Sequence, residues 1–201
     1  MNQQIIKHFQ KNDKILFSVL KKAGSVQKLH SDKPKNYFCR LCREIIGQQL
    51  VSKASQAIFS RFEKLFSNKK ITLHKTLKIS HRVMRKAGLS NAKAKYIRNL
   101  AKDVVDKKLN FKDLKNLDNE QVIKELIKVK GIGPWTAEMF LMFTLARKDV
   151  FSPGDLGLRK AIKRLYGFKK EPTEKQIKEI TNKWRPYRTY ACLVLWKNID
   201  N

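Results

Sequence analysis

The sequence predicts an all-α protein, and three observations support this prediction. Apolar residues recur at helical spacing along most of the 201 residues, whereas the apolar-polar alternation of a strand never lasts more than a few positions. Helix stop and start signals separate the apolar segments, as at Ala87-Gly88-Leu89-Ser90. A hydrophobic content of 42% is enough to build a core at this length. We therefore expect one globular domain made of helices.

The predicted helices share an apolar face and end at a capping residue or a turn. In chain order they span residues 5–23 (a short helix and a longer one), 37–66 (two helices), 71–87 (two short helices), 91–107, 118–127, 134–146, a helix from 155 onward and a final apolar helix after 184. Ser52 is expected to cap the second helix of the 37–66 pair. Lys93, Lys95, Arg98 and Lys102 are expected to form a solvated face of the helix at 91–107.

The charge of the chain indicates a polyanionic partner. Lys and Arg number 45 against 17 Asp and Glu, which gives a net charge of +28 spread over most of the length. Nucleic acid is the usual partner of such a field, although a lysine-rich proteome would also raise the charge. No apolar run approaches the roughly 20 residues that cross a bilayer, and the N-terminal residues do not resemble a secretory signal. We expect no membrane partner, and a cytoplasmic, nucleoid-associated protein in a bacterium or a nuclear one in a eukaryote.

The three cysteines do not predict a disulfide framework or a metal site. Cys39 and Cys42 form a Cys-x-x-Cys pair inside an amphipathic helical pattern. A metal site would need a second pair of ligands at comparable spacing, and only Cys192 remains. We interpret the pair as small residues of the core or its boundary.

A turn with two glycines is the strongest local motif. Gly131 and Gly133 flank Ile132 between two helical patterns, and Pro134 occupies the first position of the next helix. Because glycine has no Cβ, a phosphate can approach the backbone N–H groups of the turn, and the following helix adds the positive end of its dipole. Lys130 adds a mobile charge. The pattern favours a backbone grip on a DNA phosphate over an ordinary helical hairpin.

Two further positions are ambiguous from the residues alone. Asp155 follows Pro153-Gly154 at the head of a helix, where capping alone explains an aspartate. At a helix junction Gln48, Gln49 and Leu50 interrupt the apolar pattern. They fit either a solvated loop, which is the simpler interpretation, or a probe that enters a base stack.

Five segments together carry a family resemblance. In chain order they are Ile45-Ile46-Gly47-Gln48-Gln49-Leu50, then Ala87-Gly88-Leu89-Ser90 with Lys93 and Ala94, then Val129-Lys130-Gly131-Ile132-Gly133-Pro134-Trp135-Thr136-Ala137, then Asp149-Val150-Phe151-Ser152-Pro153-Gly154-Asp155, and then Trp184-Arg185-Pro186-Tyr187-Arg188-Thr189-Tyr190-Ala191. In this order the chain resembles the helix-hairpin-helix superfamily of DNA glycosylases, and within it the 3-methyladenine DNA glycosylase II group.

The resemblance implies two helical lobes with DNA across the cleft between them. The middle lobe would comprise residues 50–145 with the hairpin at 126–137, and residues 1–49 and 146–201 would form the second lobe. No additional N-terminal β domain is expected. The resemblance also implies that a monovalent cation, Na⁺ or K⁺, is held in the hairpin by the backbone carbonyls of Ile127, Val129 and Ile132, and no other cofactor is expected.

The resemblance also assigns roles to individual residues. It identifies Asp155 as the catalytic aspartate, the hairpin as the phosphate anchor, and the region of Gln49 and Leu50 as the wedge. The implied DNA contacts are those of Gln48, Gln49, Leu50, Ser52, Lys130, Gly131, Ile132, Gly133 and Thr136. The implied base pocket is lined by Trp135, Met139, Leu156 and Tyr187. Met139 and Leu156 stand where the best-known bacterial relative has tyrosines, so this pocket would be less aromatic.

One position in the hairpin helix determines the expected reaction. Relatives that also cleave the strand, such as endonuclease III, have a lysine where this chain has Trp135, and that amine forms a Schiff base with the sugar. Without it, water must attack the sugar. We expect a monomeric, monofunctional glycosylase of base excision repair that removes 3-methyladenine and 7-methylguanine from double-stranded DNA. The alternatives are a glycosylase for hypoxanthine or uracil, and a non-catalytic module that recognises distorted DNA.

Overall fold

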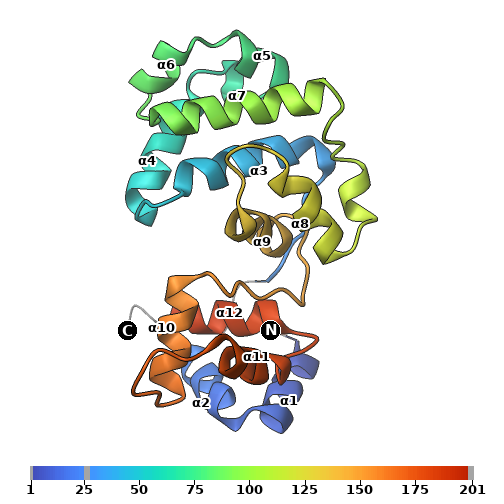
Figure 1. Cartoon of the computed structure of the whole chain (residues 1–201), viewed down its shortest axis with the longest axis vertical. Helices are drawn as coiled ribbons and strands as arrows, with labels where there is room; N and C mark the ends of the chain where they lie inside the picture. The colour runs from blue at the N-terminus through green and yellow to red at the C-terminus, as the bar shows by residue number, and fades with distance from the viewer. Residues whose placement is uncertain (1, 25–27, 199–201) are drawn as a thin grey trace. The chain divides into compact units, whose positions relative to one another are not determined.

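A computed structural model describes residues 2–24 and 28–198 of the chain, and all regular secondary structure in these residues is helical (Figure 1). The all-α prediction is confirmed. The chain divides into two compact units, one made of residues 31–145 and the other of the described residues up to His30 and from Ala146 onward. None of the described helices combines the length and the apolar character that crossing a bilayer requires.

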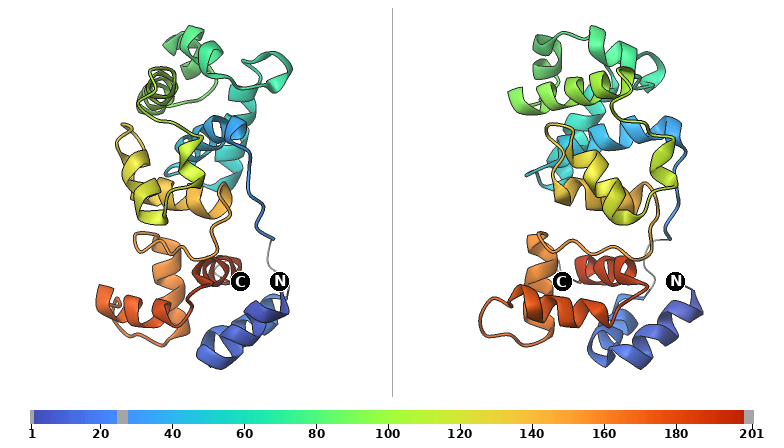
Figure 2. Two further views of the ribbon diagram at one scale, coloured as in Figure 1. Left: turned by 90° about the vertical axis from the view of Figure 1, so that its right-hand side faces the viewer. Right: turned by 45° about the vertical axis from the view of Figure 1, so that its right-hand side comes forward.

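The unit of residues 31–145 holds the central helices of the chain. They are α3 (Pro34–Gly47), α4 (Ser52–Glu63), α5 (Leu73–Lys78), α6 (His81–Lys86), α7 (Asn91–Val105), α8 (Asn119–Ile127) and α9 (Pro134–Phe143), with short 3-10 helices η1 (Ser67–Lys69) and η2 (Asp113–Lys115). Figure 2 shows α5 and α6 beside α7. Helix α3 packs against α4, α7 and α9, and α8 packs against α9.

The position of α3 corrects the predicted domain boundary. Residues 34–47 were expected in the second lobe, but they belong to the middle unit, so the boundary lies between residues 30 and 31 instead of 49 and 50. The physical reason is the apolar face of α3. Its Tyr37, Leu41 and Ile45 are fully buried, and helices α4, α7 and α9 cover that face.

The second unit joins the two ends of the chain. Its helices are α1 (Gln3–Asn12), α2 (Lys14–Ala23), α10 (Leu156–Leu165), α11 (Glu174–Asn182) and α12 (Arg188–Lys197). The predicted short and longer helices near the N-terminus are equal in length, 10 residues each. Helix α12 packs against both α10 and α2.

A buried carboxylate connects the two ends of the chain in this unit. Asp13 caps α2 by accepting a hydrogen bond from the Leu16 N–H at 3.0 Å. Its other oxygen accepts the Trp184 indole N–H at 2.8 Å and the Tyr166 hydroxyl. Burial and the hydrogen bond to Asp13 raise the pKa of Tyr166. A carboxylate with several donors is stable in the core, so Asp13 fixes α2 to the C-terminal half of the unit.

The start signal at Ser90 is confirmed, and the capping prediction for Ser52 is wrong. The Ser90 side chain caps α7 by accepting from the Lys93 N–H, and Asp118 forms a capping box with Gln121 at the start of α8. Helix α4 has no side-chain cap, because its N-cap position is Val51 and Ser52 is already the first helical residue.

Two basic side chains of α7 are not merely solvated, which corrects a second prediction. The Lys93 ammonium donates to the carbonyls of Ile46 at 2.8 Å and Gln48 at 2.7 Å. Arg98 donates to the carbonyls of Leu77 at 3.0 Å and of Ile79, the residue that follows α5. Both cations satisfy carbonyl groups at helix C-termini, where the helix dipole also favours positive charge.

Cys39 and Cys42 lie in the core and at its boundary, as the sequence predicts. Cys42 is fully buried in α3 and Cys39 is half-buried, and burial raises the pKa of both thiols. No group of three or more His, Cys, Asp or Glu side chains within residues 2–24 and 28–198 is arranged to hold a metal ion.

Candidate active site

The two glycines of the hairpin between α8 and α9 have different structural roles. Gly131 has a φ of 102°, and a Cβ at this position would lie 2.1 Å from Cγ of Tyr96 on α7. Only glycine therefore fits there. Gly133 has a φ of −95°, and a Cβ there would meet no atom within 4 Å. The fold does not require a glycine at this exposed position, which leaves the backbone at the start of α9 open.

Gln48 braces the hairpin from the end of α3. Its side-chain amide donates to the Gly131 carbonyl at 2.9 Å and to the Thr136 hydroxyl at 3.0 Å. Thr136 is buried, so its hydroxyl is directed into the unit. Because Lys93 holds the Gln48 carbonyl, the end of α3, the hairpin and α7 form one hydrogen-bonded assembly. Burial lowers the pKa of Lys93.

The chain after this brace is exposed. Gln49 has a φ of 57°, and the Leu50 N–H donates to the Gly47 carbonyl at 3.1 Å, which closes a tight turn. Leu50 is 38% exposed and Val51 is 75% exposed. Two adjacent apolar side chains in water at a turn are a costly arrangement that suits contact with another apolar surface. Val51 was not among the predicted contacts, although its position beside Leu50 in the sequence is a signal for it.

The carbonyls that the resemblance assigns to a monovalent cation lie at the end of α8 and in the hairpin turn. The Val129 carbonyl accepts the Ile132 N–H at 3.0 Å, and a carbonyl oxygen has a second lone pair for a ligand. The Val129 and Ile132 side chains are buried, so the turn is held in a fixed conformation. Ile127 ends α8, where carbonyl groups lack helical partners. Carbonyl oxygens of this kind suit Na⁺ or K⁺.

Asp155 lies in the other unit at the start of α10. Its Oδ1 accepts the Leu158 N–H at 2.8 Å, which confirms that it caps the helix. The same oxygen accepts the indole N–H of Trp196 on α12 at 3.3 Å. The carboxylate is only partly buried, whereas Leu156 beside it is 71% exposed. Hydrogen bonds from two N–H donors favour the ionised form of a carboxylate in general.

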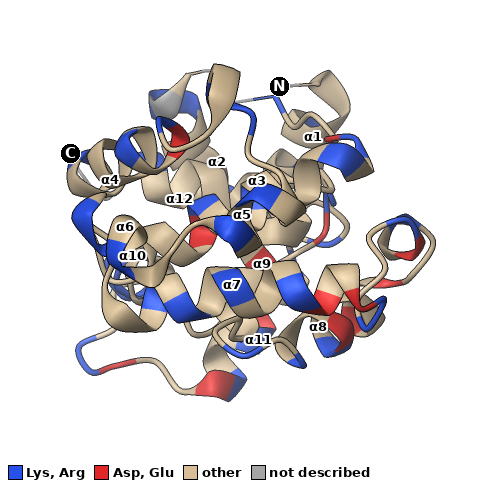
Figure 3. Ribbon diagram, turned by 90° about the horizontal axis from the view of Figure 1, so that it is seen from above, with Lys and Arg blue, Asp and Glu red and all other residues tan. Residues whose placement is uncertain are grey.

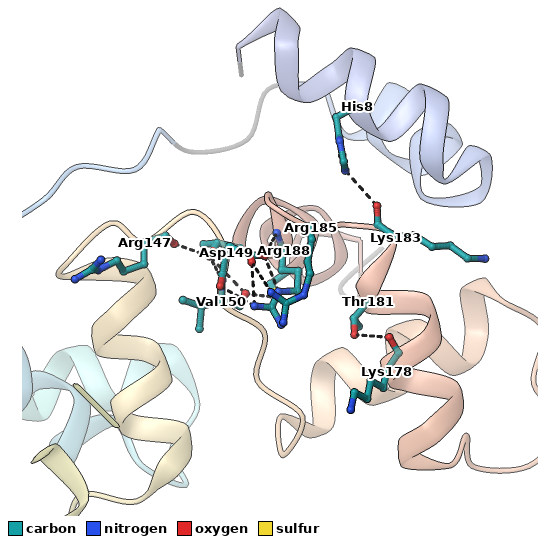
Figure 4. Close-up of polar contacts among 11 residues, drawn as sticks. His8, Arg147, Asp149, Val150, Lys178, Thr181, Lys183, Arg185 and Arg188 are labelled. Atoms are coloured by element: carbon teal, nitrogen blue, oxygen red, sulfur yellow. Dashed lines mark hydrogen bonds and ion pairs between the residues drawn. The ribbon is translucent and has the colours of Figure 1, made fainter. Parts of the chain in front are cut away.

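The loop that leads to Asp155 is held by the beginning of α12 (Figure 4). Arg188 forms a two-pronged ion pair with Asp149, with Nε 2.6 Å from Oδ1 and Nη2 3.1 Å from Oδ2, and Arg185 reaches Oδ2 at 3.3 Å. The Thr189 hydroxyl donates to the Arg147 carbonyl at 2.6 Å and accepts the Val150 N–H at 3.0 Å. These contacts fix the loop backbone over residues 147–150.

The predicted pocket residues are divided between the units. Trp135 and Met139 lie on α9, the first half-buried and the second buried, while Leu156 and Tyr187 belong to the unit of Asp155. The Tyr187 ring lies edge-on to His8 at a centroid distance of 5.2 Å. The His8 ring also donates to the Lys183 carbonyl at 3.1 Å (Figure 4). Helix α1 therefore holds Tyr187 in place, which no sequence motif indicated.

These features define an all-helical protein of the helix-hairpin-helix class, with the hairpin in one unit and a helix-capping aspartate in the other. A family model described as HhH-GPD superfamily base excision DNA repair protein matches residues 42–186. The chain belongs to this family. The resemblance inferred from the five segments is confirmed.

Known relatives agree in sequence and in fold. DNA-3-methyladenine glycosylase 1 of Schizosaccharomyces pombe is 32% identical over 181 residues, which are 89% of this chain and 79% of the relative. The crystal structure of a DNA-3-methyladenine glycosidase from Bacillus halodurans has a TM-score of 0.84 at 37% identity, over 98% of this chain and 90% of the other. The S. pombe 3-methyladenine DNA glycosylase in complex with abasic DNA has a TM-score of 0.90 at 30% identity, over 99% and 98%.

Proposed function

We propose that this protein is a DNA glycosylase of base excision repair that hydrolyses the N-glycosidic bond of alkylated purines in double-stranded DNA. The relatives named 3-methyladenine DNA glycosylases support both the reaction and the substrate class. The observation that carries the proposal is the Asp155 carboxylate, which is held by two N–H donors at the start of α10. The substrates would be 3-methyladenine and 7-methylguanine.

The positive charge of an alkylated purine explains why one carboxylate would be enough to hydrolyse its N-glycosidic bond. An alkylated purine is cationic and is already a good leaving group. The enzyme then has to stabilise a sugar with oxocarbenium character and to position water. An anionic carboxylate attracts the developing positive charge, most strongly where water is excluded, and it can accept a proton from the attacking water. Asp155 would fill both roles, and Trp135 and Tyr187 would hold the cationic base by stacking.

The residue at position 135 supports a monofunctional reaction. An indole offers no amine, so Trp135 cannot form a Schiff base with the sugar, and water is the nucleophile. The product would be an unbroken strand with an abasic site. A protein of this kind would act as a monomer on one flipped base at a time.

We further propose that the hairpin anchors a DNA phosphate and that Gln49, Leu50 and Val51 contact the base stack. Support for the anchor comes from Gly133. The fold would tolerate a side chain at this position, so packing does not explain why the residue is a glycine. Ser52 and Lys130 are exposed beside these segments and would contact the backbone. Gln48, Thr136 and the Gly131 carbonyl would act by holding the hairpin in position. A bound Na⁺ or K⁺ would stabilise the same turn.

The Asp155→Asn variant tests the proposal. Asparagine is an equally good N-cap, so α10 and the fold should be unchanged. Release of 3-methyladenine and 7-methylguanine from methylated duplex DNA should fall by more than about 100-fold. Free base is measured by chromatography, and strand breaks are measured on a denaturing gel before and after alkaline treatment.

The outcome separates three functions. Wild-type protein should release free base and leave an abasic strand that breaks only in alkali, while the affinity of the variant for DNA persists. Release of uracil or hypoxanthine instead of methylated purines would assign the other substrate class. If no base were released from any lesion, the proposal would be overturned. The remaining interpretation would be a non-catalytic DNA-binding module.

A further inference from the structure

We propose that Trp196 is a positioning residue that fixes the orientation of the Asp155 carboxylate. The inference rests on the proposed function, because it concerns the group that would stabilise the sugar cation. Trp196 lies on α12 and Asp155 at the start of α10, and the indole Nε1 lies 3.3 Å from Oδ1 of the carboxylate. Both residues belong to the same compact unit.

A second donor changes what the helix cap can do. The terminal torsion of an aspartate side chain is broad, so a single cap bond leaves the carboxylate plane free to rotate. In this protein Oδ1 accepts two bonds, one from the Leu158 N–H at 2.8 Å and one from Trp196. The two donors come from different helices. Together they limit rotation and fix the plane in which the carboxylate meets a developing positive charge.

Helix α12 is a firm support for the Trp196 indole. The helix packs against α10 and α2, and Val194 and Leu195, which directly precede Trp196, are buried. Its first turn holds the loop that leads to Asp155 through the Arg188–Asp149 ion pair and the Thr189 contacts. The same helix therefore fixes the start of the loop and the carboxylate at its end. Sites supported on rigid helices hold their geometry better than sites on loops.

The Trp184 indole shows what a purely structural bond of the same type looks like. It donates to Asp13 at 2.8 Å, and both groups are buried. Trp196 and Asp155 are only partly buried, so their bond is not enclosed in the core as that of Trp184 is. The two indoles thus form a matched pair of indole-to-carboxylate bonds in one unit, one in the core and one at the proposed reaction centre.

The kinetic test uses the same substitution at both positions. Trp196→Phe keeps an aromatic ring but loses the indole N–H, so the single-turnover rate of base release should fall by about 10- to 100-fold while the Kd for lesion DNA stays unchanged. Trp184→Phe should lower the Tm, and below the Tm its rate should equal that of the wild type. An unchanged rate in Trp196→Phe, or an equal loss in both variants, would overturn the proposal.

A spectroscopic test does not depend on activity. The chain has three tryptophans, so a ¹⁵N spectrum contains three indole N–H signals, which the Trp→Phe variants assign. The Asp155→Asn substitution should move the Trp196 signal and leave the Trp184 signal in place, because the charged acceptor is lost only at Asp155. An unmoved Trp196 signal would overturn the inference. A wild-type protein that releases no base from any lesion would instead overturn the proposed function, so the two failures are distinguishable.

Discussion

Asp155 performs a structural and a proposed chemical task with the same carboxylate. As an N-cap it satisfies a backbone N–H that helix geometry leaves without a partner. An aspartate is common at this position, so residue statistics explain it without any reaction. What distinguishes Asp155 is the indole donor from α12, since a helix cap needs only one acceptor bond. The second donor is the local indication that the carboxylate has a further role.

At the same scale, Glu44 on α3 should make stability depend on pH. Burial raises the pKa of Glu44 to about 7, and the nearby charges of Arg43 and Arg40 offset only part of this effect. In the unfolded chain the group titrates near pH 4.3. The folded state therefore binds more protons between these values, and this contribution to stability is present below about pH 4.3 and is lost as pH rises through about 7.

The Glu44→Gln variant should remove this dependence. At pH 8 it should be more stable than the wild type by on the order of 2 kcal/mol, and at pH 4 the two should be nearly equal. Urea unfolding at several pH values measures the difference. Glu179→Gln is the control, since it removes the same charge from an exposed position on α11. A constant difference between wild type and Glu44→Gln across the pH range would contradict the prediction.

At the scale of elements, the two hairpin glycines should respond in opposite ways to alanine. Gly133→Ala should leave the Tm unchanged, because its backbone conformation is ordinary and the new Cβ meets no atom within 4 Å. The methyl group would stand where we propose that a phosphate approaches α9. The Kd for duplex DNA should therefore rise by about 10-fold, which corresponds to the loss of one hydrogen bond.

Gly131→Ala provides the contrast. Its new Cβ would lie 2.1 Å from Cγ of Tyr96, and the positive φ adds strain, so the free energy of unfolding should fall by more than about 2 kcal/mol. Thermal unfolding and fluorescence anisotropy with labelled duplex DNA measure both effects. If Gly133→Ala bound DNA as tightly as the wild type, the proposed phosphate contact at the hairpin would be wrong.

The elements also show which features a sequence can predict. Helical periodicity located the helices, and the local start signal at Ser90 marked a true cap, because both depend on near neighbours. Other features depend on residues that are far apart in the chain, and no local pattern encodes them. Examples are the packing of α3 in the middle unit and the hydrogen bond from Lys93 to the Ile46 carbonyl. The pairing of Trp196 with Asp155 was missed for the same reason.

The candidate site was predictable only where a motif marked it. Asp155 and the hairpin lie in segments whose order resembles a known family, so their residues could be named. Gln48 was named with them as a DNA contact, but its amide is used within the hairpin brace, and a glutamine in a polar stretch gives no sign of which partner it has. The position of Val51 beside Leu50 was a signal for a contact role, but its 75% exposure is not what the residue type indicates, because valine is usually buried.

At the scale of the whole molecule, the dominant property is charge. The net charge is +28, and Figure 3 shows Lys and Arg on many helices, including α7, with fewer acidic positions. A charge spread over many helices raises affinity for any DNA and does not select a lesion. Lesion selection would therefore depend on the pocket and on Asp155, while the overall field brings the protein to DNA. Salt separates the two contributions, because it screens the field and competes for phosphates.

The affinity for undamaged and damaged duplex DNA should fall steeply and in parallel as salt rises. With about six phosphate contacts, the affinity should drop by about 1,000-fold between 50 and 200 mM salt. Lys130→Gln should reduce the magnitude of the slope of log affinity against log salt by about 1, which corresponds to one phosphate contact. Asp155→Asn should leave the slope unchanged. At saturating protein, the single-turnover rate of base release should vary little with salt, because the reacting groups do not bind phosphate. A rate that fell in step with affinity would mean that the charged surface also takes part in the chemical step, and a slope near zero would remove DNA phosphates as the target of the charge.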